Sequence, residues 1–306
     1  MSGSREAVVA LDVGGTGIKC ALVSATGEVL HTERHPTGAA RGPAAVVETI
    51  LDLAEGLVGK ARADGLTPVA VGLTAPGVVD EVAGVAAWSA NVGFRDVPLR
   101  DLVSTRLGLP AALGHDVRAG GLAEARLGSG RGFRHVLFVA IGTGIAAAHV
   151  VDGQGFSGAH GAAGELGHIV VRPGGTPCGC GARGCLEAEA SAAGVSRRYM
   201  AVSGGEATAA EVVARAAGGD AVAIQVWAET IEVLADGLVT AQTLYDTEAM
   251  VLGGGLAEAG EALLDPLRLA IRARLRFQRE PTLVHAALGD EAGCVGAALL
   301  ALDARP

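Results

Sequence analysis

Four side chains that carry the donor atoms preferred by zinc lie in one glycine-rich stretch of the chain. They are His168, Cys178, Cys180 and Cys185, and their spacing is His-x9-Cys-x-Cys-x4-Cys. Three thiolates and one imidazole fill the four positions of a tetrahedral Zn²⁺ ion, which leaves no position for water and makes such an ion structural. The alternatives are four unrelated residues or a disulfide bond. The spacing favours the structural zinc site.

Three glycine-rich turns are candidates for holding the phosphates of a nucleotide. The turns are Asp12-Val13-Gly14-Gly15-Thr16-Gly17, Gly142-Thr143-Gly144 and Gly253-Gly254-Gly255. In the first turn the backbone N–H groups and the Thr16 hydroxyl can face a phosphate, and Asp12 can hold a hydrated Mg²⁺ ion. A single turn of this kind is also explained as a plain hairpin, but here the sequence Gly-Thr-Gly-Ile occurs twice. Neither a Rossmann loop, which opens a helix, nor a Walker A loop, which contains Gly-Lys-Ser/Thr, fits the first turn.

Asp116 is a candidate general base. It lies after a predicted strand at 109–113 and before a predicted helix at 117–127, where loop geometry can direct its carboxylate toward a substrate. Phosphoryl transfer needs positioning, charge neutralisation and one acceptor for the proton of the attacking hydroxyl. The same position also suits a helix N-cap. The spacing alone does not separate these two roles.

The elements that must position these residues form a duplicated strand–glycine turn–strand unit. The first copy joins strands at 7–13 and 18–23, and the second joins strands at 135–141 and 146–151. Further strands are predicted at 29–33, 69–73, 109–113, 248–252 and 282–286, and helices at 43–63, 98–107, 117–127, 220–245, 259–275 and 292–302. The duplication predicts two α/β domains. We expect an N-terminal domain over 1–116 and a C-terminal domain over 117–306, with a zinc loop at about 155–190 and a last helix, at about 292–303, that can pack with either domain.

The composition indicates a globular protein. The 306 residues are 50% hydrophobic and 19% charged, which excludes a disordered chain and allows about two domains. A net charge of −9 without a strong basic face argues against nucleic-acid binding. The longest uncharged apolar run, 136–148, is shorter than the roughly 20 residues of a membrane span, and the N-terminus does not resemble a signal peptide. We therefore expect a soluble cytoplasmic protein that binds neither nucleic acid nor membranes.

The sequence indicates no chemical role for the remaining cysteines or for most of the remaining histidines. Cys20 and Cys294 lie in apolar contexts and are expected to be buried core thiols. Isolated histidines such as His31 and His35 are expected to be structural or on the surface.

Two motifs resemble those of a known family. The segment Asp12-Val13-Gly14-Gly15-Thr16-Gly17-Ile18-Lys19 resembles the phosphate-1 motif of the ROK (repressor, ORF, kinase) sugar kinases, and 138–168, with Gly164-Glu165-Leu166-Gly167-His168 at its end, resembles the family signature. The resemblance covers nearly the whole chain in order. It implies an actin/hexokinase-like (ribonuclease H-like), duplicated two-domain α/β fold with the active site in an interdomain cleft. It also implies ATP-dependent phosphorylation of a hexose or hexosamine, usually at O6.

The resemblance also implies roles for individual residues. Asp116 matches the catalytic base. The residues implied to contact the sugar are Gly77, Asn91, His115, Asp116, Glu165, His168 and Glu187. The residues implied to hold ATP and Mg²⁺ are Asp12, Gly14, Gly15, Thr16, Lys19, Gly142, Thr143, Gly144, Gly254 and Gly255. The zinc ligands of zinc-binding members match the four His and Cys residues, and members of the family are commonly homodimers or homotetramers.

The chain departs from the family pattern beside the residues implied to contact the sugar. Gly114-His115-Asp116 stands where the family usually has Glu-Asn-Asp, and Ala90 replaces the proline usual before Asn91. The missing asparagine normally hydrogen-bonds a sugar hydroxyl, so the substrate is open among glucose, N-acetylglucosamine, N-acetylmannosamine and kanosamine (3-amino-3-deoxyglucose).

Other functions are weaker alternatives. A catalytically weak sugar-sensing protein is the main one, and a zinc-ribbon interaction module is another. Repressors of the family carry a helix-turn-helix segment ahead of the phosphate-1 motif, and the short segment before Asp12 leads us to expect none here.

Overall fold

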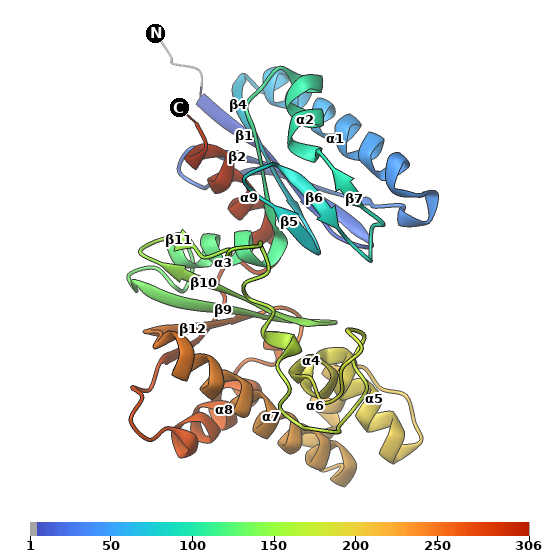
Figure 1. The fold of residues 1–306 in the computed structure, drawn as a ribbon, viewed down its shortest axis with the longest axis vertical. Helices are drawn as coiled ribbons and strands as arrows, with labels where there is room; N and C mark the ends of the chain where they lie inside the picture. Colours follow the sequence, from blue (N-terminus) through green and yellow to red (C-terminus); the bar gives the residue numbers. More distant parts are fainter. Residues whose placement is uncertain (1–4, 306) are drawn as a thin grey trace. The chain divides into compact units, whose positions relative to one another are not determined.

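The computed structural model describes residues 5–305 and divides into two compact units. Unit 1 contains the described residues up to Ala123, the segment Gly155–Ala163 and the described residues from Asp290 onward. Unit 2 contains Glu124–Gln154 and Gly164–Gly289. Each unit is built around its own five-stranded mixed sheet (Figure 1).

The sheet of unit 1 has the strand order β3-β2-β1-β4-β8. Its strands are β1 (Arg5–Val13), β2 (Gly17–Ser24), β3 (Val29–Pro36), β4 (Leu66–Ala75) and β8 (Ala111–His115). Strands β1, β2 and β3 pair antiparallel, whereas β4 runs parallel to β1 and β8 runs parallel to β4. Because β1 is buried on both faces, it is a continuous run of hydrophobic residues rather than an alternating one.

Helices cover both faces of this sheet. Helix α1 (Pro43–Ala63) packs against the face that carries Val9 and Leu11, and α9 (Ala292–Asp303) packs against the face that carries Val8 and Ala10. A side chain at Gly72 of β4 would collide with the backbone of α9, so this glycine allows the helix to lie directly on the sheet. Helix α2 (Leu99–Leu107) and the small antiparallel sheet of β5 (Val78–Asp80), β6 (Val85–Trp88) and β7 (Arg95–Val97) complete the unit, and α3 (Asp116–Arg126) follows β8.

The sheet of unit 2 repeats this plan. Its strand order is β11-β10-β9-β12-β13, with β9 (His135–Ile141), β10 (Ile145–Val151), β11 (Gln154–Gly155), β12 (Ala249–Gly253) and β13 (Thr282–His285). Strand β10 is antiparallel to β9, β12 is parallel to β9, and β13 is parallel to β12. Strands β10, β9, β12 and β13 thus run in the same relative directions as β2, β1, β4 and β8 of unit 1. The duplicated α/β architecture that we predicted is therefore confirmed.

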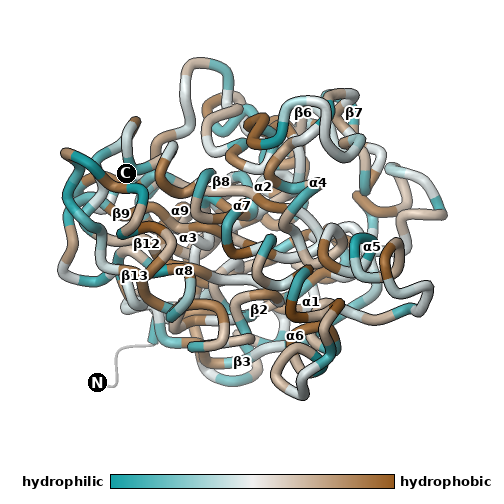
Figure 2. The backbone as a smooth tube through the Cα atoms, turned by 90° about the horizontal axis from the view of Figure 1, so that it is seen from below, coloured by the Kyte–Doolittle hydropathy of each residue, from teal (hydrophilic) through white to brown (hydrophobic). Residues whose placement is uncertain are grey.

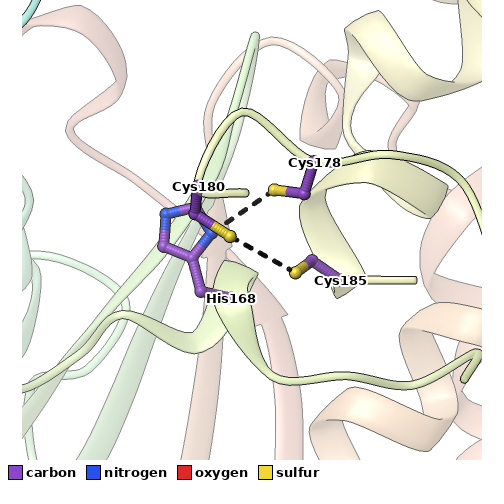
Figure 3. Close-up of side chains that lie close together, drawn as sticks. All are labelled: His168, Cys178, Cys180 and Cys185. Atoms are coloured by element: carbon purple, nitrogen blue, oxygen red, sulfur yellow. Dashed lines mark hydrogen bonds between the residues drawn. The ribbon is translucent and has the colours of Figure 1, made fainter. Parts of the chain in front are cut away.

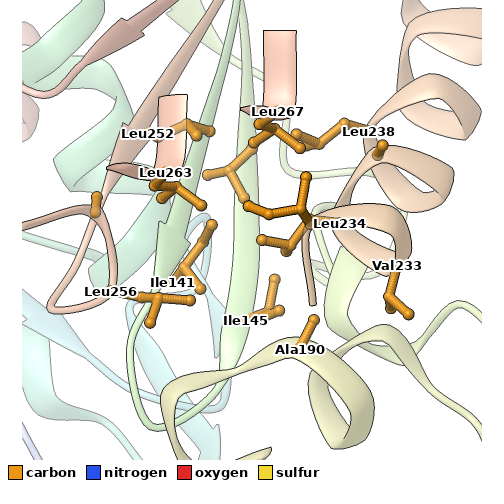
Figure 4. Packing of buried hydrophobic residues seen from close by; sticks show 14 of the residues in the cluster. Ile141, Ile145, Ala190, Val233, Leu234, Leu238, Leu252, Leu256, Leu263 and Leu267 are labelled. Atoms are coloured by element: carbon orange, nitrogen blue, oxygen red, sulfur yellow. The ribbon is translucent and has the colours of Figure 1, made fainter. Parts of the chain in front are cut away.

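The core of unit 2 lies between this sheet and a group of helices, some of which pack on other helices of the group. The helices are α4 (Leu186–Ala190), α5 (Ala192–Ser203), α6 (Ala209–Ala217), α7 (Ala221–Tyr245) and α8 (Glu261–Arg274). Leu234 and Leu238 of α7 and Leu263 and Leu267 of α8 belong to the same buried cluster as Leu252 of β12 (Figure 4). Short 3₁₀ turns are η1 (Ala39–Arg41), η2 (Leu166–His168), η3 (Ala257–Ala259) and η4 (Gly289–Glu291).

Some elements were not among those predicted from the sequence. They include the three short strands β5 to β7 and the helices α4, α5 and α6. Hydrophobic and hydrophilic segments alternate along the chain (Figure 2). Between residues 5 and 305, none of the helices combines the length and the hydrophobicity that crossing a membrane requires.

Candidate functional site

The first glycine turn closes the β1–β2 hairpin. The Gly14 N–H donates to the Gly17 carbonyl at 2.9 Å, and a Cβ at Gly14 would lie at that same distance from the carbonyl oxygen. Thr37, just past β3, holds the turn from outside: its hydroxyl donates to the Gly14 carbonyl at 2.6 Å and its N–H donates to the Thr16 carbonyl at 3.1 Å. The Thr16 side chain is exposed, so its hydroxyl is available to a ligand.

The carboxylate of Asp12 is held at the end of β1. It accepts a hydrogen bond from the Thr74 hydroxyl at 2.8 Å, and its other oxygen lies 3.8 Å from Lys19 Nζ. The first turn of α9 lies so close that a side chain at Gly293 would collide with this carboxylate. A helix N-terminus carries a partial positive charge, so the start of α9 attracts the Asp12 carboxylate. Lys19 also reaches Asp290, at 3.3 Å.

Asp116 is the first residue of α3, at the carboxyl end of β8. One carboxylate oxygen accepts the Val117 N–H at 2.7 Å and lies 3.3 Å from Nδ1 of the buried His115 ring. About 30% of the side-chain surface remains exposed. Burial, and secondarily the neighbouring Asp12 carboxylate, raise the pKa of Asp116 to about 7. A carboxylate with this pKa accepts a proton near neutral pH far better than an ordinary aspartate.

An ion pair between the buried Arg118 and the partly exposed Glu81, which the sequence analysis missed, supports the β8–α3 junction. Arg118, only 5% exposed, donates through Nε to Glu81 at 2.9 Å and through Nη1 to the Gly161 carbonyl at 2.9 Å. The same Glu81 oxygen accepts the His115 N–H at 3.2 Å. The pair therefore fixes the backbone on both sides of Asp116. The one sequence signal for it is a charged residue two positions after the candidate base.

Two residues implied to bind sugar lie in the small sheet region of unit 1. Asn91 is exposed in the turn between β6 and β7, and its Cβ would lie 2.9 Å from a Cβ built at Gly15. The structure thus brings Asn91 beside the first glycine turn. Gly77, between β4 and β5, has a φ of +100°, and a side chain there would collide with the Trp88 carbonyl. Only glycine fits this backbone position.

The second and third glycine turns lie together in unit 2. The Gly142 N–H donates to the Gly144 carbonyl at 2.9 Å, closing the β9–β10 hairpin. Gly254 has a φ of +83°, and a Cβ there would lie 2.7 Å from the carbonyl oxygen of Ile141, the residue that precedes the second turn. The space beside Gly255 is open. Thr143 is exposed, as Thr16 is in unit 1.

Glu187 links the second glycine turn to the zinc loop. Its carboxylate accepts the Ile145 N–H at 3.0 Å, and a side chain at Gly144 would collide with it. Glu187 lies in α4, which begins directly after Cys185. Glu187 thus places a carboxylate of the segment after the zinc ligands at the hairpin of β9 and β10.

The four predicted zinc ligands lie together in unit 2 (Figure 3). Their ligand atoms all lie within 4.8 Å of one another. Cys178 Sγ is 3.7 Å from His168 Nδ1, and Cys180 Sγ is 3.7 Å from Cys185 Sγ. Two sulfurs at about 2.3 Å from a tetrahedral Zn²⁺ ion lie about 3.8 Å apart, so the donor set and its spacing fit zinc.

The zinc loop is also held by its own polar contacts. The buried Glu189 accepts the Thr176 N–H at 2.7 Å, and Cys178 N–H donates to the Ala182 carbonyl at 2.9 Å. Nε2 of His168, the ring nitrogen away from the sulfurs, lies 3.9 Å from Glu165. With Nδ1 on a metal, Nε2 carries the proton and faces this carboxylate, an arrangement typical of metal-bound histidines.

Cys20 and Cys294 are both buried, as predicted. They lie on opposite faces of the unit 1 sheet, and Cys294 Sγ donates to the Lys19 carbonyl at 3.4 Å.

The sequence and the fold both match known proteins. The chain matches the ROK family over residues 8–304. It is 32% identical to a glucokinase of Halalkalibacterium halodurans, over 94% of this chain and 92% of that protein. A ROK hexokinase from Thermus thermophilus has a TM-score of 0.83 and 33% identity, covering 96% of this chain and 97% of that one. A ROK family glucokinase from Streptomyces griseus, solved in complex with glucose and AMPPNP, has a TM-score of 0.81 and 32% identity, covering 97% and 99%.

These likenesses confirm the two-domain, actin-like α/β fold implied by the phosphate-1 motif. They extend over nearly the full length of this chain and of the proteins it resembles, and the motifs that first indicated the family lie within the matched residues. The chain belongs to the ROK family.

Proposed function

We propose that this protein is an ATP-dependent kinase that transfers the γ-phosphate of MgATP to the 6-hydroxyl of a hexose or amino-hexose. The observation that carries the proposal is the Asp116 carboxylate, whose pKa is raised to about 7 at the same end of the sheet as the first glycine turn. Similarity to glucokinases, one of them solved with glucose and AMPPNP, supports both substrates.

The chemical step that this arrangement supports is a direct transfer. The sugar O6 forms a bond to the γ-phosphorus as the bond from that phosphorus to the bridging oxygen of ADP breaks. Asp116 accepts the proton that O6 loses, and His115, Glu81 and Arg118 hold the backbone and carboxylate of Asp116 in place. Positioning and charge stabilisation supply most of the catalysis in such reactions.

The glycine turns are assigned to the nucleotide. Backbone N–H groups at 14–17 and 142–144, with the exposed hydroxyls of Thr16 and Thr143, would face the phosphates. Gly254 and Gly255 would lie against the base and α-phosphate. Asp12, with Lys19 beside it, would hold hydrated Mg²⁺, whose charge offsets that of the phosphates when it is bound.

The sugar is assigned to residues of both units. In unit 1 these are Asn91, His115 and the backbone at Gly77. In unit 2 they are Glu165, His168 and Glu187, which the zinc loop positions. Carboxylates accept hydrogen bonds from neighbouring sugar hydroxyls, and a bound Zn²⁺ ion would hold His168 in a fixed ring orientation.

The Asp116→Asn variant tests the base. We expect kcat to fall by about 10²- to 10⁴-fold, because the amide cannot accept the proton. In the wild-type protein, kcat/KM for the sugar should fall as the pH drops below about 7, where Asp116 becomes protonated. A coupled assay of ADP release with glucose and MgATP measures both.

Stability separates a lost base from a lost fold. The pKa of Asp116 is higher in the folded protein than the ordinary aspartate value, so folding binds a proton and the wild-type protein loses stability as pH rises from about 4 to 7. At pH 8 the variant, which buries no charge, should therefore be more stable by about 1–3 kcal/mol. Near-native turnover in the variant would contradict the assignment of Asp116 as the base. So would a residual activity that falls below pH 7 as it does in the wild-type protein.

Cys180→Ser tests the zinc loop. The variant should lose one zinc ion per chain, and its KM for sugar should rise by about tenfold or more while KM for ATP changes less, because Glu165, His168 and Glu187 lose their support. Elemental analysis and steady-state kinetics on the same preparation measure this. Retained zinc would contradict Cys180 as a required ligand, and lost zinc with an unchanged sugar KM would contradict the part of the loop in sugar binding.

His115→Asn tests the choice of sugar. Restoring the residue usual in the family should shift the ratio of KM for kanosamine to KM for glucose in favour of glucose by about three- to tenfold, the worth of one hydrogen bond. If both sugars keep their KM ratio and only kcat changes, His115 acts on Asp116 alone and does not select the substrate.

A further inference from the structure

A second cluster of metal-binding side chains lies in unit 1, apart from the zinc loop. Cys20, Glu33 and His35 each place one ligand atom within 4.8 Å of the other two. Among the described residues, only this group and the zinc loop of unit 2 bring three or more His, Cys or carboxylate ligands so close. No motif indicates this cluster, because the cysteine is separated along the chain from the other two residues and their spacing matches no known metal site.

The pairing of β2 with β3 creates this cluster. Cys20 lies directly opposite Glu33 in the antiparallel register, and His35 is opposite Ile18. Because side chains alternate along a strand, all of these residues lie on one face of the sheet, the face covered by α1. Two neighbouring residues of an edge strand thus flank the thiol of the next strand.

One ring nitrogen of His35 makes no hydrogen bond. Its Nε2 atom is buried without a hydrogen-bond partner, although it lies 3.2 Å from a Glu33 oxygen. The other Glu33 oxygen lies 3.5 Å from Nε2 of His31. Buried polar atoms normally have a partner. A metal ion bound among the ring nitrogen, the carboxylate and the thiol would give this nitrogen its partner.

We propose that Cys20, Glu33 and His35 bind a second transition-metal ion of the Zn²⁺ type. A thiolate, an imidazole and a carboxylate are all ligands of Zn²⁺, whereas the thiolate and imidazole disfavour Mg²⁺ and Ca²⁺. Three protein ligands leave the fourth position for water. Glu33 and His35 are about one-third exposed, so the ion enters from solvent and exchanges more readily than an ion with four protein ligands.

An ion at this site would affect the first glycine turn. The ion would join β2 to β3 two residues before Thr37, whose hydroxyl and N–H hold the Gly14–Thr16 backbone. Fixing the two strands to each other would fix Thr37 against the turn. Binding of this ion should therefore change KM for ATP more than KM for sugar. That kinetic effect rests on the proposed function, but the binding of the ion does not.

Zinc stoichiometry tests the proposal. The full-length protein is dialysed against buffered free Zn²⁺ and its zinc is measured by elemental analysis. We expect two zinc ions per wild-type chain and one in Cys20→Ser and in His35→Gln. Because Cys20 is in the core and its variant can lose stability, His35→Gln, on the partly exposed edge strand, gives the same answer without disturbing the core.

A matched control is Cys294→Ser, which replaces another buried thiol of unit 1 on the opposite face of the sheet and should keep two ions. In Cys180→Ser, added Co²⁺ should still give a thiolate-to-cobalt absorption band, and that band should disappear when Cys20→Ser is combined with it. One zinc ion per wild-type chain, or two in His35→Gln, would overturn the proposal whatever the kinase assay shows.

Discussion

Two carboxylates held at the same end of one sheet are the constraint on which the unit 1 site depends. Asp12 is the last residue but one of β1 and Asp116 directly follows β8, with only β4 between these strands. Burial raises the pKa of Asp116 most, and the negative charge of the nearby Asp12 raises it further. The arrangement costs stability above neutral pH and gives in return a carboxylate suited to accept a proton. A protein selected for stability alone has no reason to keep it.

Most of the surrounding structure offsets that cost or holds the two groups in place. Thr74, Lys19 and the first turn of α9 stabilise Asp12, and the Glu81–Arg118 pair secures the backbone beside Asp116. Two glycines also help to place these groups. At Gly72 and Gly293 the missing side chain lets α9 lie against β4 and Asp12.

The local features of the site were predictable from the sequence. The glycine turns, the zinc-ligand spacing and the strand before Asp116 each depend on residues close together in the chain, and the repeated Gly-Thr-Gly-Ile indicated the duplicated fold. Contacts that depend on pairing between distant segments were not predictable. Arg118 pairs with Glu81 and contacts the 161–163 segment, and Cys20 meets Glu33 and His35 only through the β2–β3 register. A shift of that register by one residue would move Glu33 and His35 to the opposite face.

Phosphoryl transfer to a sugar is the central claim, and turnover across a panel of sugars tests it most directly. ADP release from MgATP would be measured with glucose, mannose, galactose, allose, glucosamine, kanosamine, N-acetylglucosamine and N-acetylmannosamine, on protein of known zinc content. Our account predicts turnover with at least one of these sugars and a product phosphorylated at O6. No ADP release with any of them, from folded protein with its zinc loop occupied, would contradict the kinase assignment and favour a protein that binds sugar without turning it over.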